Sequence, residues 1–84
     1  MSVLYAVQIR AARIFLGWRQ DELAKAAKVG IATIQRIEQA GGLAMGNVAT
    51  IMRLQHALEK AGIKFLDTDR DGGPGVRWKR PPSV

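Results

Sequence analysis

Four stretches of the chain repeat apolar residues at the three- and four-residue spacing of a helix. They cover residues 3–16, 20–27, 31–39 and 48–61. Gly17 follows the first stretch and Gly62 the last, at the position where glycine commonly ends a helix. Asn47 directly precedes the fourth stretch and is a good N-cap. The pattern therefore predicts four helices.

The period changes after residue 62. Residues 63–67 and 76–79 alternate roughly between apolar and polar side chains, and a glycine-rich, acidic segment separates them. This arrangement predicts a β-hairpin with Val76 and Trp78 facing Phe65 and with Arg77 and Lys79 facing outward. We therefore expect a helical domain over 1–62, a hairpin extension over 63–80 and a disordered tail over 81–84.

The two middle stretches are short and lie close together in the sequence. Leu23, Ala24 and Ala27 share one face of the first, and Ile34 and Ile37 share one face of the second. The second helix is therefore amphipathic, with a polar, positively charged side for solvent or a ligand. The residues between them, 28–30, are few enough to form a tight turn, with Gly30 as N-cap of the second helix.

The segment RAARIFLGWRQDELAKAAKVGIATIQRIE resembles the DNA-binding domain of the Xre/Cro-like repressor family, and the likeness extends over roughly the first 60 residues. The resemblance implies a mainly α-helical, lambda-repressor-like bundle of four to five helices with a helix-turn-helix, here followed by a hairpin. Three residues depart from the family pattern. Lys28 replaces the usual turn glycine and would have to accept a left-handed conformation, while Arg19 and Gly30 replace the usual Ser or Thr caps.

The same resemblance implies a DNA-binding surface. Base edges are expected to meet Gly30, Ile31, Ala32, Gln35 and Arg36. Arginine suits guanine, glutamine suits adenine, and a small apolar side chain suits the thymine methyl group. Phosphates are expected to meet Gln20 at the start of its helix, with Arg19, Lys25 and Lys28 nearby. The resemblance also implies a partly buried ion pair between Arg13 and Glu38.

Composition agrees with a nucleic-acid partner. The 84 residues suffice for one domain, and 13 basic against seven acidic residues give a net charge of +6. Such a surplus suggests a polyanion as partner. The absence of cysteine fits a reducing cytosol, and no apolar run approaches the roughly 18 residues of a membrane span. We expect a cytoplasmic, nucleoid-associated protein that does not enter membranes.

Catalysis finds little support in the residue types. The chain has one histidine, no cysteine and no glycine loop followed by the lysine and hydroxyl of a phosphate-binding motif. His56 has no companion at a metal-ligand spacing and is read as an ordinary helix residue. We expect no enzyme activity, no cofactor and no metal.

A different function remains open on the same surface. An exposed Ile31 beside Gln35 and Arg36 would suit a hydrophobic centre with a polar rim, as in protein interfaces. The chain would then be an antiactivator or antitoxin that inhibits another transcriptional regulator, possibly in addition to binding DNA.

A third expectation concerns self-association: a single recognition helix reads few base pairs, so we expect a weak homodimer through the helix 48–61 or through the hairpin edge. Leu43 and Met45, in the uncharged loop before that helix, are expected to turn inward.

Overall fold

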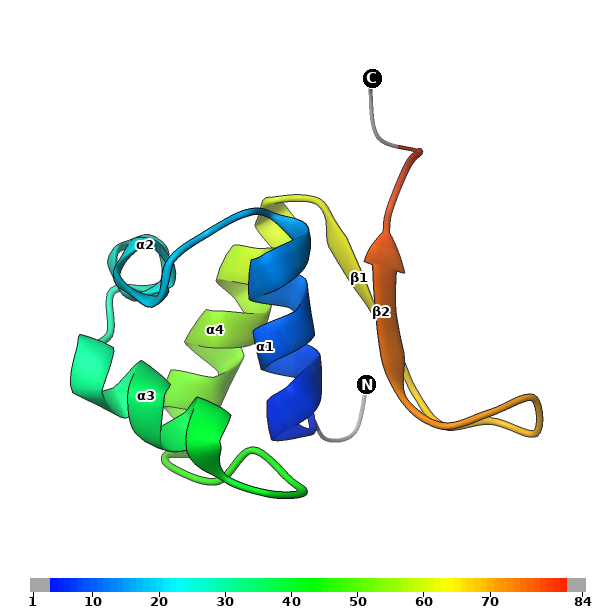
Figure 1. Cartoon of the computed structure of the whole chain (residues 1–84), viewed down its shortest axis with the longest axis horizontal. Helices are drawn as coiled ribbons and strands as arrows, with labels where there is room; N and C mark the ends of the chain where they lie inside the picture. The colour runs from blue at the N-terminus through cyan, green and yellow to red at the C-terminus, as the bar shows by residue number, and fades with distance from the viewer. Residues whose placement is uncertain (1–3, 82–84) are drawn as a thin grey trace.

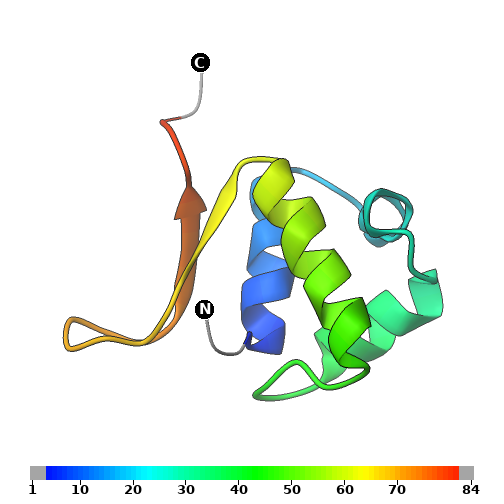
Figure 2. The ribbon, with the colours of Figure 1, turned by 180° about the vertical axis from the view of Figure 1, so that it is seen from behind.

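Two helices, α1 and α4, lie side by side at the centre of the molecule, with α2 and α3 on one side and a β-hairpin on the other (Figures 1 and 2). The computed structural model describes residues 4–81. Its elements are α1 (Ala6–Phe15), α2 (Gln20–Ala27), α3 (Ile31–Gln39), α4 (Val48–Lys60), β1 (Ile63–Leu66) and β2 (Gly75–Trp78). The fold is therefore mainly helical, with four helices and a two-stranded antiparallel sheet.

One hydrophobic core joins all four helices and β1. Its largest fully buried side chains are Ile9, Leu23, Ile34, Ile37, Leu54, Leu58 and Ile63. Phe65 belongs to the same cluster, and Val76 and Trp78 pack against it from β2. The hairpin is therefore anchored in the helical core, although the sequence pattern treated it as an extension.

Gln8 ties the hairpin to α1 with polar contacts. This side chain is 2% exposed. Its Nε2 donates to the carbonyl oxygens of Leu66 and Gly75, each at 3.1 Å, and its Oε1 accepts from the N–H of Tyr5 at 2.8 Å. One amide thus satisfies backbone groups on both strands and at the start of α1, groups that would be costly to bury alone.

The first helix begins later than predicted. Val3 lies outside the described residues, and the chain before Ala6 is extended, with Tyr5 at φ −93° and ψ 149°. The N–H of Ala44 donates to Leu4 O at 2.8 Å, and the N–H of Ala6 donates to Gly42 O at 2.9 Å. Backbone pairing with the loop after α3 therefore overrides the helical spacing of this segment.

That same pairing reverses the predicted orientation of two loop side chains. The expectation that Leu43 and Met45 turn inward is wrong, since they are 40% and 67% exposed. Ala44, between them, packs against the core instead. In an extended segment successive side chains point to opposite sides, so placing Ala44 inside sends both neighbours outward.

The turn between α2 and α3 is built as predicted from the residues. Lys28 has φ 59° and ψ 46°, and it is the one non-glycine residue with a positive φ within 4–81. Its N–H donates to Lys25 O at 3.3 Å, and the N–H of Val29 donates to Ala24 O at 3.0 Å. This pair of bonds is the Schellman motif, in which the left-handed position is usually glycine. Gly30 follows as the extended N-cap of α3.

The remaining element ends follow the sequence closely. The side-chain oxygen of Asn47 accepts from the N–H groups of Ala49 and Thr50, which confirms the predicted cap of α4. Residue 61, predicted as the last helical residue, is the C-cap. Ile63 pairs with Trp78 and Phe65 with Val76, while Arg77 and Lys79 are exposed as expected.

Two further expectations concern membrane-spanning segments and the tail over 81–84. Within residues 4–81 no helix is both long and apolar enough to cross a membrane. Of the tail predicted over 81–84, only Pro81 is described, and it is exposed. Residues 82–84 lie outside the described part.

Candidate functional site

The outer face of α3 presents the side chains that the resemblance assigned to base contacts. The exposed positions are Gly30, Ile31, Ala32, Gln35 and Arg36. Ile31 is 44% exposed although it is a large apolar residue. The opposite face is buried through Ile34, Ile37 and Glu38. The helix therefore has one side fixed in the core and one side free, and Gln35 and Arg36 lie on the free side.

The orientation of α3 follows from its neighbours. Figure 1 looks nearly along α2 while α3 runs across the view, so the two helices cross at a steep angle. Ala24 and Ala27, which face the core from α2, are small enough for a close approach. The short turn and the shared core then hold the outer face of α3 clear of the rest of the fold.

An ion pair fastens the end of α3 to α1. Arg13 Nε donates to Glu38 Oε2 at 2.8 Å, and Arg13 Nη2 donates to Glu38 Oε1 at 2.9 Å. The Glu38 side chain is 3% exposed and that of Arg13 is 15% exposed. Arg10 Nη1 adds a 2.7 Å bond to the Glu38 carbonyl oxygen, near the negative end of the helix dipole. The structure thus brings together the two residues that the resemblance paired.

Gln20 belongs to the same buried network. Its Nε2 donates to Glu38 Oε1 at 3.2 Å, and its side chain is half-buried. The resemblance assigned Gln20 to phosphate. In the structure the Gln20 side chain connects the start of α2 to the end of α3 through its hydrogen bond to Glu38. It therefore helps to fix the position of these two helices relative to each other.

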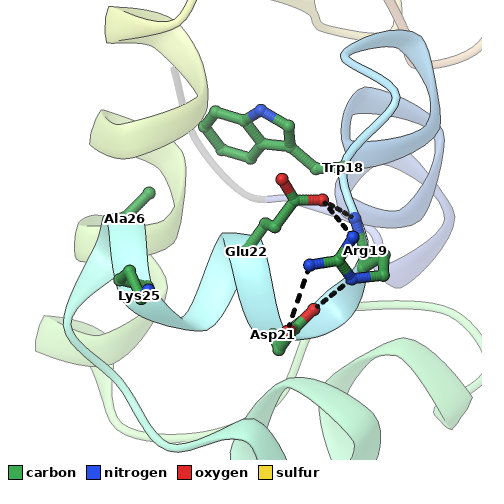
Figure 3. A pocket seen from close by; sticks show the side chains of 6 residues that line it. All are labelled: Trp18, Arg19, Asp21, Glu22, Lys25 and Ala26. Atoms are coloured by element: carbon green, nitrogen blue, oxygen red, sulfur yellow. Dashed lines mark hydrogen bonds and ion pairs between the residues drawn. The ribbon is translucent and has the colours of Figure 1, made fainter.

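Arg19 is turned toward carboxylates of its own helix. Figure 3 shows its guanidinium between Asp21 and Glu22 at the mouth of a shallow pocket that Trp18 also lines. Arg19 Nε lies 3.0 Å from Asp21 Oδ1, and Nη1 lies 3.7 Å from Glu22 Oε1. Glu22 also accepts from the Arg19 N–H at 2.8 Å, which caps α2 without a Ser or Thr. A phosphate at this position would compete with two carboxylates.

These contacts shift the titration of both partners. The hydrogen bond from Arg19 lowers the pKa of Asp21 below its usual value. The hydrogen bond to Asp21 and its charge, with the charge of Glu22, raise the pKa of Arg19. Arg19 and Asp21 therefore stay charged throughout the neutral range, and their charges largely cancel.

The remaining predicted cations are free. Within residues 4–81 the ion pairs use only Arg13 and Arg19 among the basic residues. Lys25, Lys28 and Arg36 are exposed and unpaired. They lie at the end of α2, in the turn and on α3.

Sequence reasoning missed a second group of basic side chains, on α4. Arg53, His56 and Lys60 line a groove together with Lys28, and all four are exposed. Their spacing of three and four residues puts the α4 members on one helix face. That spacing was readable in the sequence, but His56 was weighed only as a metal ligand. Among the described residues no three His, Cys, Asp or Glu side chains are placed to hold a metal ion.

No family model, curated protein or solved structure matches the chain. The features of the chain that bear on function are therefore the surface of α3, the charges near it and the sequence pattern of residues 10–38. A function for this protein has to explain why α3 exposes a guanidinium, an amide and an isoleucine side chain together.

Proposed function

We propose that the protein is a small sequence-specific DNA-binding transcriptional regulator, a repressor of the helix-turn-helix class, that reads the major groove with α3. The observation that supports this most directly is the outer face of α3. It exposes Gln35 and Arg36, free of intramolecular ion pairs, on a helix whose other face is fixed by the core and by Glu38. A rigid helix with free planar donors on one side suits the edges of base pairs.

Each exposed side chain has a chemical counterpart in the groove. Arg36 can donate two parallel hydrogen bonds to guanine, and Gln35 can donate to and accept from adenine. Ile31 and Ala32 offer apolar contact to thymine methyl groups. Lys25 and Lys28 supply positive charge for phosphates beside the groove, where contacts add affinity but no sequence information.

The proposal includes a weak homodimer formed by the loop before α4 and the first half of α4. Met45, Val48 and Met52 are 67%, 73% and 62% exposed there. Residues 39–52 contain no charged side chain, so two chains of charge +6 can approach at this surface with little repulsion. Sedimentation at rising protein concentration, with and without bound DNA, tests this pairing. Monomers alone in every condition would exclude it.

Selection of bound fragments from random-sequence duplex DNA tests the function itself. We expect the wild-type protein to enrich a defined motif. Arg36→Ala should weaken binding to that motif by about 1–3 kcal/mol and relax the preference at one base pair. Arg70→Ala removes an equal charge from the exposed hairpin loop and is the matched control. An Arg36→Ala protein with unchanged motif and affinity would contradict the proposal.

One observation favours a second candidate, the inhibition of another regulator by direct contact. Ile31 is exposed at the start of α3, with Ala32 beside it and with Gln35 and Arg36 exposed further along the helix. Such a surface also suits the centre of a protein interface. Salt separates the two candidates, because binding to DNA phosphates falls steeply between about 50 and 200 mM salt while an apolar contact survives.

A further inference from the structure

A groove of about 410 Å³ runs between the end of α2 and one face of α4. Ala26, Ala27 and Ala57 are its small side chains. Its other four lining residues are Lys28, Arg53, His56 and Lys60. Figure 2 shows α4 in front and α2 to its right, with the turn into α3 beyond α2. The groove therefore begins at the turn that leads into α3.

The lining of this groove contains three cations and no carboxylate. A second basic hollow, at the hairpin, differs in this respect. At the hairpin, Lys64, Arg77 and Lys79 share their hollow with Glu59 and Asp67. Unlike the hairpin, the α2–α4 groove gathers positive charge that nothing within it offsets, so an anion is the ligand that it suits.

The conformation of Lys28 points the same way independently of the charges. Its backbone is left-handed at φ 59°, which a side chain disfavours and glycine would accept freely. Its side chain is exposed and forms no ion pair. Residues held in a disfavoured backbone conformation cluster at functional sites, and here the side chain of such a residue brings an ammonium group to the groove.

We propose that this groove holds the sugar–phosphate backbone of the duplex that α3 reads, so that α4 adds phosphate contacts beside the base contacts. Lys28 is three residues before Ile31, and from there the groove continues along α4. The step from Arg53 to Lys60 measures about 10 Å along a helix. Phosphates of one strand follow each other about every 3.4 Å along the duplex axis, so Arg53 and Lys60 reach separate phosphates. This inference rests on the proposed function.

The experiment compares two double variants that each remove two positive charges. Arg53→Gln with Lys60→Gln alters the groove, and Arg77→Gln with Lys79→Gln alters the hairpin on the opposite side of α1 and α4. All four side chains are exposed, and circular dichroism verifies that both variants fold. Binding of the duplex selected by the wild-type protein is followed by fluorescence anisotropy between about 50 and 200 mM salt.

We expect the logarithmic salt slope of the groove variant to be shallower than the wild-type slope by about 1.8, which is two phosphate contacts. The selected motif should stay the same, and the hairpin variant should keep the wild-type slope. Equal losses in both variants, or none in the groove variant, would overturn the inference. So would a groove variant that binds DNA normally but no longer binds poly-glutamate, since the groove would then fit an acidic protein segment. A wild-type protein that selects no duplex would instead refute the proposed function.

Discussion

Lys28→Gly should stabilise the protein although it deletes a whole side chain. Lys28 adopts φ 59° and ψ 46°, and its contacts in the Schellman turn are made by its backbone. The left-handed conformation costs a residue with a Cβ about 1–2 kcal/mol. Glycine escapes that cost but loses more backbone freedom on folding, and a cation at the end of α2 is also lost, about 0.3 kcal/mol. With about 0.5–1 kcal/mol for the lost backbone freedom, the net expectation is a gain of about 0.5 kcal/mol.

Lys28→Ala is the control that separates conformation from charge. It removes the same ammonium group but keeps a Cβ in the left-handed position, so it should be less stable than wild type by about 0.3 kcal/mol. Urea and thermal unfolding measure both variants. A gain of about 0.5 kcal/mol corresponds to a rise of about 2–4 °C in Tm for a domain of this size.

The same two variants also report on DNA. Each should lose about 0.9 from the logarithmic salt slope of DNA binding, because each lacks one phosphate contact. Lys28→Gly would thus be more stable and bind more weakly. A Lys28→Gly protein no more stable than Lys28→Ala would refute the idea that Lys28 is held against its backbone preference.

Two further substitutions test the contacts that hold α3 and the hairpin in place. Glu38→Gln should lower the free energy of unfolding by at least about 3 kcal/mol, since it leaves the Arg13 charge buried without its partner. Arg19→Gln alters an exposed pair and should leave the free energy of unfolding nearly unchanged in the same urea titration. Gln8→Leu should lower the free energy of unfolding by about 2–4 kcal/mol and weaken the hydrogen-exchange protection of the hairpin amides, because it removes three hydrogen bonds, two of them from α1 to the strands. Gln55→Leu, which loses only a 3.2 Å bond to Glu59, should leave that protection unchanged.

Local signals in the sequence were enough to predict α2, α3 and the turn between them. The bounds of α2 and α3 match the predicted ranges, and Lys28 is left-handed at the position where the resemblance implied a turn glycine. The cap at Asn47 and the inward face of the hairpin were also predictable, because capping and strand alternation depend on neighbours in the sequence.

Contacts between distant segments account for the misses. The chain before Ala6 is extended because it pairs with a loop some 40 residues later, and no helical periodicity within 3–16 carries that information. The same pairing places Ala44 against the core and leaves Leu43 and Met45 exposed. The prediction placed every second side chain of this segment inside, as an extended chain requires, but it chose the wrong set. A shift of one residue exchanges the side chains on the two faces.

The candidate site also has one part that the sequence predicted and another part that it did not. The exposed residues of α3 were predictable from helical periodicity, since burying Ile34 and Ile37 leaves Gln35 and Arg36 outside. The partners of Arg19 and Gln20 depended on side-chain geometry across α2 and α3. The groove required the packing of α2 on α4, which only a three-dimensional structure supplies.

The burial of Ile63 and Phe65 has a consequence for how the chain reaches its native state. During synthesis the helices emerge first, but they lack two of the side chains that complete their interior until residues 63–65 have left the ribosome. Acquisition of the final structure is therefore expected to be delayed and all-or-none, with a single unfolding transition. A fragment truncated at residue 62 would expose a hydrophobic hollow and be prone to aggregate.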